Sequence, residues 1–206
     1  EYVKTYSNEL NQSVYIRPER LWASKKGFLK GVSRFSNQTR IRIKRKTNVF
    51  NGNAAFNPFF SNIDDTSLIS TTSNLRNTLY FNRTSSVFGA QYVYQDLQSK
   101  TLLASGFDSR LLNSHEVSIR WNIKKQFTFE AKGAVGNKAS AADYTSGRDY
   151  SLSFFSVEPS IIYQPSTTFR ITLDGRVSEK TNSALLGGEV SKVLEFGSTF
   201  KYNQAQ

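Results

Sequence analysis

The stretch VSIRWNIKKQFTFEAKGAV, residues Val117–Val135, decides the fold of this chain. Apolar and polar side chains alternate from Val117 to Lys124, and they alternate again from Phe127 to Val135. Because successive side chains of a strand point to opposite faces, this period of two predicts two strands, each with one apolar and one polar face. The polar residues Lys124–Gln126 between the two runs predict the tight turn of a hairpin.

The same pattern recurs along the chain. Further alternating runs are Leu75–Arg83, Val87–Gln95, Phe155–Gln164 and Phe169–Val177. Turns predicted at Thr84–Ser86 and Gln164–Thr167 place the short turns about 40 residues apart. Pro159 cannot donate a hydrogen bond to a sheet, so it predicts a bulge or an exposed edge at that point.

Longer polar stretches separate these hairpins. The predicted loops are Gln98–Asn113, Asn137–Asp149 and Ser178–Ala184. With the less regular runs Asn8–Trp22 and Phe28–Lys46 near the start and the weaker runs Leu186–Leu194 and Gly197–Tyr202 near the end, we expect about ten strands. Short turns that alternate with long loops are typical of up-and-down antiparallel barrels in the outer membrane, where the short turns face the periplasm and the longer loops face outside. We therefore expect an all-β fold, an antiparallel up-and-down transmembrane β-barrel or a segment of one. Propeller blades are the alternative, but a blade needs four strands per repeat.

Composition is compatible with this fold. Mean hydropathy is −0.47 and no run of 18 apolar residues occurs, yet a barrel strand needs an apolar side chain only at every second position. The absence of cysteine excludes a disulfide scaffold and a thiolate metal site. Without an initial methionine or a signal-like segment, we expect residues 1–206 to be a single β-barrel region, a fragment of a longer chain.

No motif for catalysis stands out. His115 is the only histidine and no Gly-x-Ser-x-Gly motif accompanies it, so we expect no enzyme and no cofactor. Asp64 and Asp65 lack the spaced ligands of a calcium loop, which predicts a solvated turn and no metal. The basic run Arg40–Lys46 alternates with two isoleucines and lacks interleaved aromatic residues, so it predicts a barrel lining and not a nucleic-acid interface.

Three stretches resemble a known group of proteins. These stretches are RNTLYFNRTSSVFGAQYVYQ (Arg76–Gln95), SGFDSRLLNSHEVSIRWNI (Ser105–Ile123) and FFSVEPSIIYQPSTTFRITLDG (Phe154–Gly175). They are similar to hairpins of large outer-membrane β-barrel proteins of Bacteroidota, a largely uncharacterised group. The resemblance implies fold and location only, and it carries over no functional residue. Those barrels usually end in an aromatic strand, whereas this chain ends Asn203–Gln206, so the resemblance implies that closing strands are missing.

The expected function is that of an integral outer-membrane β-barrel protein of a Gram-negative envelope: a membrane scaffold, a pore wall or a subunit of a larger complex. Its expected partners are outer-membrane lipid, lipopolysaccharide and other envelope subunits. The lipid-facing side chains are predicted to be Phe88, Tyr92, Tyr94, Ile119, Trp121, Ile123, Phe169, Ile171 and Leu173. The lumen-facing basic side chains are predicted to be Arg76, Arg120, Lys124, Lys132, Arg170 and Arg176.

Two questions stay open at this point. The lumen either carries excess positive charge that attracts anions, or neighbouring strands pair those charges with Glu130 and Glu158. The alternative function is a secreted β-rich adhesin or polysaccharide-binding module. A barrel enzyme acting on lipid or peptide has little support in the sequence.

Overall fold

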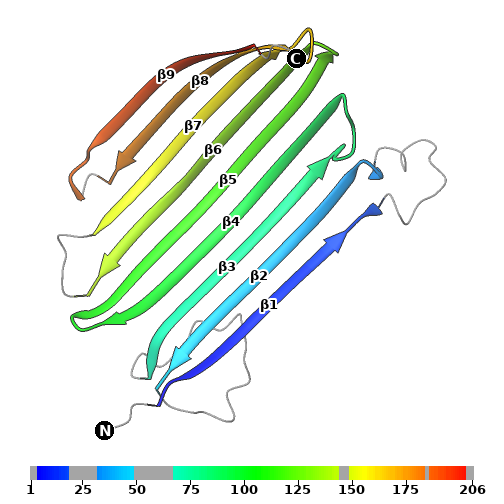
Figure 1. The fold of residues 1–206 in the computed structure, drawn as a ribbon. Helices are drawn as coiled ribbons and strands as arrows, with labels where there is room; N and C mark the ends of the chain where they lie inside the picture. Colours follow the sequence, from blue (N-terminus) through cyan, green and yellow to red (C-terminus); the bar gives the residue numbers. More distant parts are fainter. Residues whose placement is uncertain (1–3, 19–31, 49–66, 144–148, 184–185, 203–206) are drawn as a thin grey trace.

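The computed structural model describes residues 4–18, 32–48, 67–143, 149–183 and 186–202. In these ranges the chain forms one nine-stranded antiparallel sheet in which each strand pairs with the next along the sequence. Figure 1 shows this up-and-down order from β1 at one edge to β9 at the other. The all-β, up-and-down antiparallel prediction is therefore confirmed, although β1 and β9 do not pair and the sheet is open.

The strands are long. Their bounds are β1 (Tyr6–Ile16), β2 (Phe35–Thr47), β3 (Leu68–Phe81), β4 (Phe88–Leu103), β5 (Gly106–Lys124), β6 (Phe127–Ala142), β7 (Tyr150–Tyr163), β8 (Phe169–Asn182) and β9 (Val190–Tyr202). The turns predicted at Thr84–Ser86, Lys124–Gln126 and Gln164–Thr167 lie at or within the β3–β4, β5–β6 and β7–β8 connections.

The strand count and the loop pattern need correction. The structure has nine strands among the described residues, because β9 runs straight through Gly197, which pairs with Asp174 in unbroken register. The long loop expected at Gln98–Asn113 is wrong, since β4 and β5 continue to the two residues Ala104 and Ser105. The loop predicted at Asn137–Asp149 is shorter, since β6 continues to Ala142, and the loop predicted at Ser178–Ala184 is displaced, since β8 continues to Asn182 and β9 begins at Val190. The cause is that backbone hydrogen bonds extend a ladder through residues whose side chains do not alternate between apolar and polar.

Pro159 lies in an interior strand and not at an edge. It pairs with Ala131 of β6, while the ladder between β7 and β8 omits the positions between Val157↔Val177 and Ser160↔Asp174. The register on both sides of this gap is the same, so the strand tolerates the missing donor by a local interruption. Gly175 provides room, because a Cβ there would stand 3.4 Å from the Pro159 ring.

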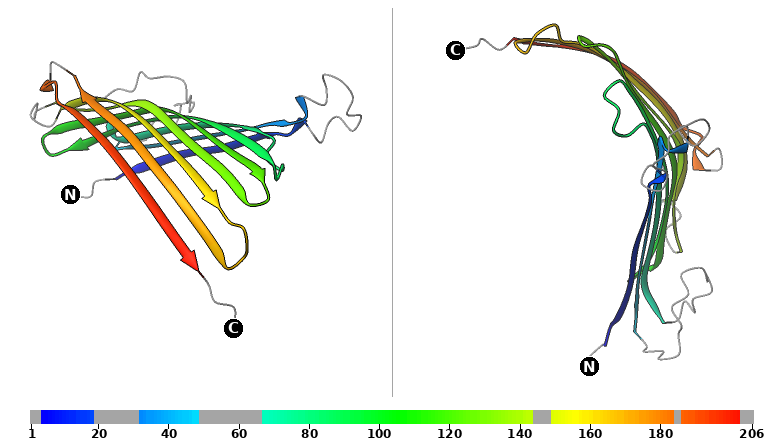
Figure 2. Two further views of the ribbon diagram at one scale, coloured as in Figure 1. Left: turned by 90° about the horizontal axis from the view of Figure 1, so that it is seen from above. Right: turned by 90° about the vertical axis from the view of Figure 1, so that its right-hand side faces the viewer.

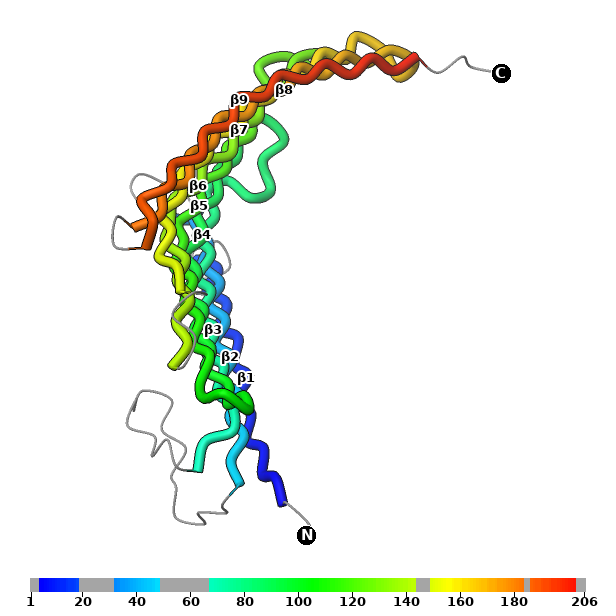
Figure 3. Tube along the Cα trace, turned by 90° about the vertical axis from the view of Figure 1, so that its left-hand side faces the viewer, coloured from blue at the N-terminus to red at the C-terminus, as the bar shows by residue number. Residues whose placement is uncertain are grey.

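The sheet bends into an arc with a concave and a convex face. Figures 2 and 3 show the curvature from three directions, and Figure 1 shows the edge strands β1 and β9 at opposite sides of the sheet. Only three apolar side chains are buried in the described part of the chain: Ile43, Leu68 and Val93. A single sheet with so small a core leaves one whole face in need of a cover.

Candidate functional site

The convex face carries a band of apolar side chains across neighbouring strands. On β6, β7 and β8 the band occupies the windows Phe127–Val135, Phe155–Tyr163 and Phe169–Val177, each nine residues long. The window on β9 is Leu194–Tyr202, of the same length. Every second residue of these windows faces the convex side, and none of those side chains is charged.

These apolar side chains are exposed in the sheet. Trp121 is 47 % exposed, Leu173 51 % and Phe196 81 %. Large contiguous apolar patches are typical of interaction surfaces and are uncommon on isolated soluble domains.

Aromatic rings line the end of the band that lies toward the β5–β6 and β7–β8 turns. Phe127 packs against Tyr163 with the rings tilted and 4.6 Å between their centroids, and Phe169 contacts Phe200 edge-on at 5.2 Å. Tyr163 and Phe169 join the two pairs at 6.4 Å. The rings thus form a continuous row across four strands, β6 to β9.

The opposite end of the band changes from apolar to polar. There the hydroxyl of Tyr92 lies 2.7 Å from His115 Nδ1, and Asn113 Nδ2 donates to the Tyr94 hydroxyl at 3.1 Å. Beyond this level the strands continue without a regular alternation of apolar and polar side chains, and Asn137 and Ser153 are hydrogen-bonded there at 2.8 Å. His115 therefore belongs to a hydrogen-bonded aromatic rim.

A polar group interrupts the band at the N-terminal side of the sheet. Asn77 Nδ2 donates to Thr39 Oγ1 at 2.7 Å, and Asn37 Nδ2 donates to Asn77 Oδ1 at 3.0 Å. The three side chains satisfy one another on adjacent strands β2 and β3. Sequence reasoning noted Asn77 as an exception to the alternation, but only the register brings Asn37 and Thr39 beside it.

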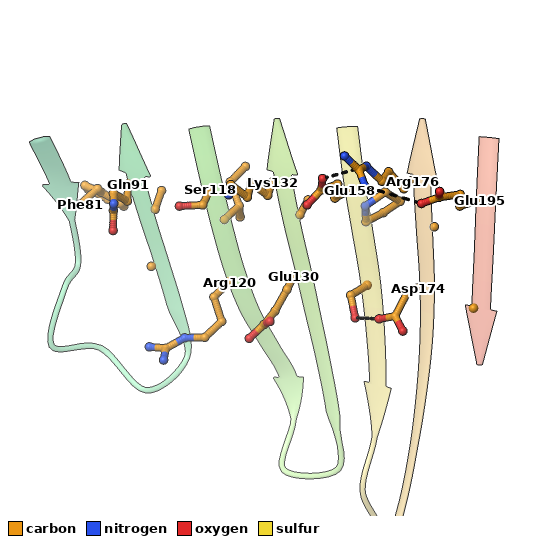
Figure 4. A pocket seen from close by; sticks show the side chains of 18 of the residues that line it. Phe81, Gln91, Ser118, Arg120, Glu130, Lys132, Glu158, Asp174, Arg176 and Glu195 are labelled. Atoms are coloured by element: carbon orange, nitrogen blue, oxygen red, sulfur yellow. Dashed lines mark hydrogen bonds and ion pairs between the residues drawn. The ribbon is translucent and has the colours of Figure 1, made fainter. Parts of the chain in front are cut away.

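The concave face carries the charges. A hollow of about 1170 Å³ opens there, over strands β3 to β9. Figure 4 shows its row of alternating charges, Lys132, Glu158, Arg176 and Glu195, on four consecutive strands. Arg176 is paired on both sides, with Nε 3.3 Å from Glu158 and NH1 3.6 Å from Glu195.

A second row of polar groups crosses the hollow nearer the turns. Arg120 and Glu130 are cross-strand partners, and Arg120 NH2 donates to the Ser85 carbonyl at 3.0 Å. Ser160 donates to Asp174 at 2.9 Å. Lys132 pairs diagonally with Glu116 at 3.5 Å, whereas the sequence alternative of paired charges named Glu130 and Glu158. Lys132 and Arg176 thus each have an acidic partner in this part of the concave face.

The structure divides the predicted site residues between the two faces. The convex face holds Phe88, Tyr92, Tyr94, Ile119, Trp121, Ile123, Phe169, Ile171 and Leu173. The concave face holds Arg76, Arg120, Lys132, Arg170 and Arg176. Lys124 lies past a register shift and pairs with Phe127, so the alternation that predicted its face ends before it. Asp64 and Asp65 lie outside the described residues.

Sequence reasoning did not find the acidic partners Glu116 and Glu195. Neither residue stands near its partner in the chain, and only the strand register could have brought them together. Within the described ranges, no three His, Cys, Asp or Glu side chains gather as a metal ion would require. No helix in the described part of the chain is long and apolar enough to cross a membrane.

No protein-family model, curated protein or solved structure matches this chain. The resemblance to Bacteroidota barrels therefore stays a prediction. The two faces of the sheet differ in charge and hydropathy, and this difference is the remaining guide to function.

Proposed function

We propose that this chain forms part of the wall of an integral outer-membrane β-barrel in a Gram-negative envelope. Its convex face contacts lipid and its concave face lines an aqueous lumen. The protein acts as a scaffold, a pore wall or a subunit of a larger envelope complex. The observation that carries the proposal is the uncharged convex band of constant width, opposite a charged concave face.

The width of the band fits a bilayer. A tilted spanning strand needs about nine to eleven residues, and each window has nine. At about 3.3 Å per residue and a tilt of about 45°, nine residues rise about 19 Å. With the aromatic row at its rim the band approaches the apolar belt of such barrels, which is about 25 Å tall and flanked by aromatic girdles.

The position of the band also fits tilted strands. On the convex face of β7 the apolar residue farthest from the β7–β8 turn is Phe155, and its partner on β8 is Glu179. The apolar window of β8 ends two residues closer to that turn, at Val177. A level belt crosses the hydrogen-bonded rows in this way when the strands tilt against the barrel axis. The drift is therefore expected for a lipid belt.

Closure requires more strands than those described. In an up-and-down sheet of nine strands, β1 and β9 run in the same direction, so pairing them directly would be parallel. Bacterial single-chain barrels are antiparallel throughout with an even strand number. An odd number of further strands must therefore lie between β9 and β1. Every residue of β9 is exposed, which agrees with an edge that is paired in the complete wall.

The parts of the strands that extend beyond the apolar band suggest how the barrel wall is oriented in the membrane. They lie on the side of the β4–β5 turn, Ala104 and Ser105, and we assign this side to the exterior, where lipopolysaccharide surrounds the barrel. The β5–β6 turn then faces the periplasm. A secreted adhesin, the alternative, would have to cover the convex band with another protein layer.

Trp121 provides a direct test. The chain has two tryptophans, so Trp22→Phe leaves Trp121 as the only one, on the convex face of β5 three residues before the strand ends at Lys124. Reconstituted into bilayers of brominated phosphatidylcholine, this variant should lose most of its fluorescence. The matched control carries Trp121→Phe and Ser118→Trp in addition, which moves the ring to the concave face, and it should retain its fluorescence. Equal quenching of both variants, or a monodisperse protein in buffer without detergent, would refute the proposal.

A further inference from the structure

The concave face is electrostatically divided. Over the middle of β5–β9 cations pair with acids, as Lys132 does with Glu116 and Arg176 with Glu158 and Glu195. Over β2 and β3 cations predominate, because Arg40, Arg42, Lys44 and Lys46 share the concave face of β2 and Arg76 lies on that of β3. Sequence analysis left open whether the lumen carries excess positive charge or pairs it with acids, and the register shows both arrangements in different parts of this face.

The centre of this region is a pair of opposed arginines. Arg40 on β2 and Arg76 on β3 are direct cross-strand partners, and both side chains are exposed on the concave face. Like charges directly opposite on a sheet destabilise it. The pair of Arg40 and Arg76 therefore lowers the stability of the sheet unless an anion binds between the two guanidinium groups.

No acid within the described ranges pairs with either arginine. Arg42, which lies two residues from Arg40 on the same face, forms an ion pair with Glu9 at 3.0 Å. The carboxylate of Glu9 is therefore already paired with another arginine. Arg40 has a neutral partner, since the Gln38 amide oxygen, oriented to satisfy its neighbours, accepts from Nε at 3.0 Å and NH2 at 2.9 Å. Both guanidinium groups thus keep donors for a ligand.

The surroundings are suited to an oxyanion. Ser13 lies opposite Arg40 on β1, and Gln95 lies opposite Arg76 on β4. Their hydroxyl and amide groups can donate additional hydrogen bonds without adding negative charge. The planar fork of Arg76 matches two oxygens of a phosphate group, and Arg40 adds the donors that Gln38 leaves free. A second like-charged pair, Arg170 on β8 and Lys201 on the edge strand β9, has the threonine pair Thr172 and Thr199 as its adjacent row.

We propose that Arg40 and Arg76, flanked by Ser13 and Gln95, form a binding site for a phosphate-type oxyanion on the concave face. The site takes a free phosphate or the phosphate of a larger solute, and it gives this part of the wall a preference for anions. It depends only on the concave face, so it stands whether or not Trp121 meets lipid.

A titration of the detergent-folded full chain with inorganic phosphate tests the site, at constant ionic strength because screening weakens exposed charges. The wild type should bind saturably. Arg40→Gln and Arg76→Gln should each weaken the apparent affinity about tenfold or more, since each removes charge-assisted hydrogen bonds. Arg110→Gln is the matched control, because it removes one concave arginine that is already paired with Asp108 at 2.9 Å, and it should bind as the wild type does.

Stability measurements distinguish a loss of phosphate binding from a loss of folding in the variants. Without phosphate, Arg76→Gln should be at least as stable as the wild type, because it removes a like-charge contact. Phosphate should stabilise the wild type against urea but not the double variant. Arg76→Lys should lose affinity although it keeps the charge, because the planar fork of the guanidinium is lost.

Three outcomes overturn the proposal: no saturation by about 10 mM phosphate, equal affinity of all variants, or an equal loss in Arg110→Gln. Titration with a soluble short-chain phosphatidic acid identifies the source of the phosphate. Saturation by inorganic phosphate supports a free anion, whereas saturation only by the lipid, with the same dependence on Arg40 and Arg76, supports a headgroup at this site.

Discussion

Leu173→Arg is the substitution that separates a lipid-covered sheet from a water-covered one. Leu173 lies at the centre of the window Phe169–Val177, four residues from each end. At about 3.3 Å per residue and a tilt of about 45°, its Cα lies about 9 Å below either rim of the band. An arginine at that depth lies near the bilayer midplane, where its side chain cannot easily carry the charge to the membrane surface.

The two environments predict different magnitudes. In a bilayer, arginine on the lipid face near the midplane costs about 2–4 kcal/mol. In water the cost is small, because Leu173 is already 51 % exposed in the sheet and surface substitutions usually stay within about 0.5 kcal/mol. The expected difference of at least about 1.5 kcal/mol lies well outside the error of an unfolding titration.

The assay is reversible urea unfolding of the full chain folded into phosphatidylcholine vesicles. Thr172→Arg is the control, since Thr172 is the adjacent residue on the concave face and its cross-strand partner Thr199 is uncharged. It should cost less than about 1 kcal/mol, as an exposed polar position does. If both variants lose the same stability, or if Leu173→Arg loses none, the convex face does not contact the hydrocarbon.

Two further predictions follow from local geometry. Gly136→Ala should destabilise the sheet by about 1–3 kcal/mol in urea unfolding, because a Cβ at this position overlaps the carbonyl oxygen of Asn113. Gly133→Ala is the control and should be nearly neutral, because its Cβ meets the nearest atom at 3.8 Å. In a chain without cysteine, Ser105→Cys should react with an impermeant maleimide on intact cells, whereas Gln126→Cys should react only after the outer membrane is breached; the opposite labelling would invert the proposed orientation.

The local alternation of side chains was enough to predict the strands and the faces of their central parts. Val117–Lys124 and Phe127–Val135 form adjacent strands of one hairpin, joined at the turn predicted between them. This works because a strand has a period of two and turn residues interrupt it, both of which are properties of neighbouring residues. The division of residues such as Ile119 and Arg120 between the faces follows from the same period.

The tertiary structure alone decided what depends on partners distant in sequence. The hairpin through Gln98–Asn113 was predicted as a loop, because a ladder held by backbone hydrogen bonds requires a paired neighbour and not an apolar face. The same holds for the charges. Arg176 meets Glu195 and Arg40 meets Arg76 only because the register of adjacent strands aligns them, and a slip of one residue would move each side chain to the other face. The sequence therefore determined which residues can share a face, and the register determined which of them meet.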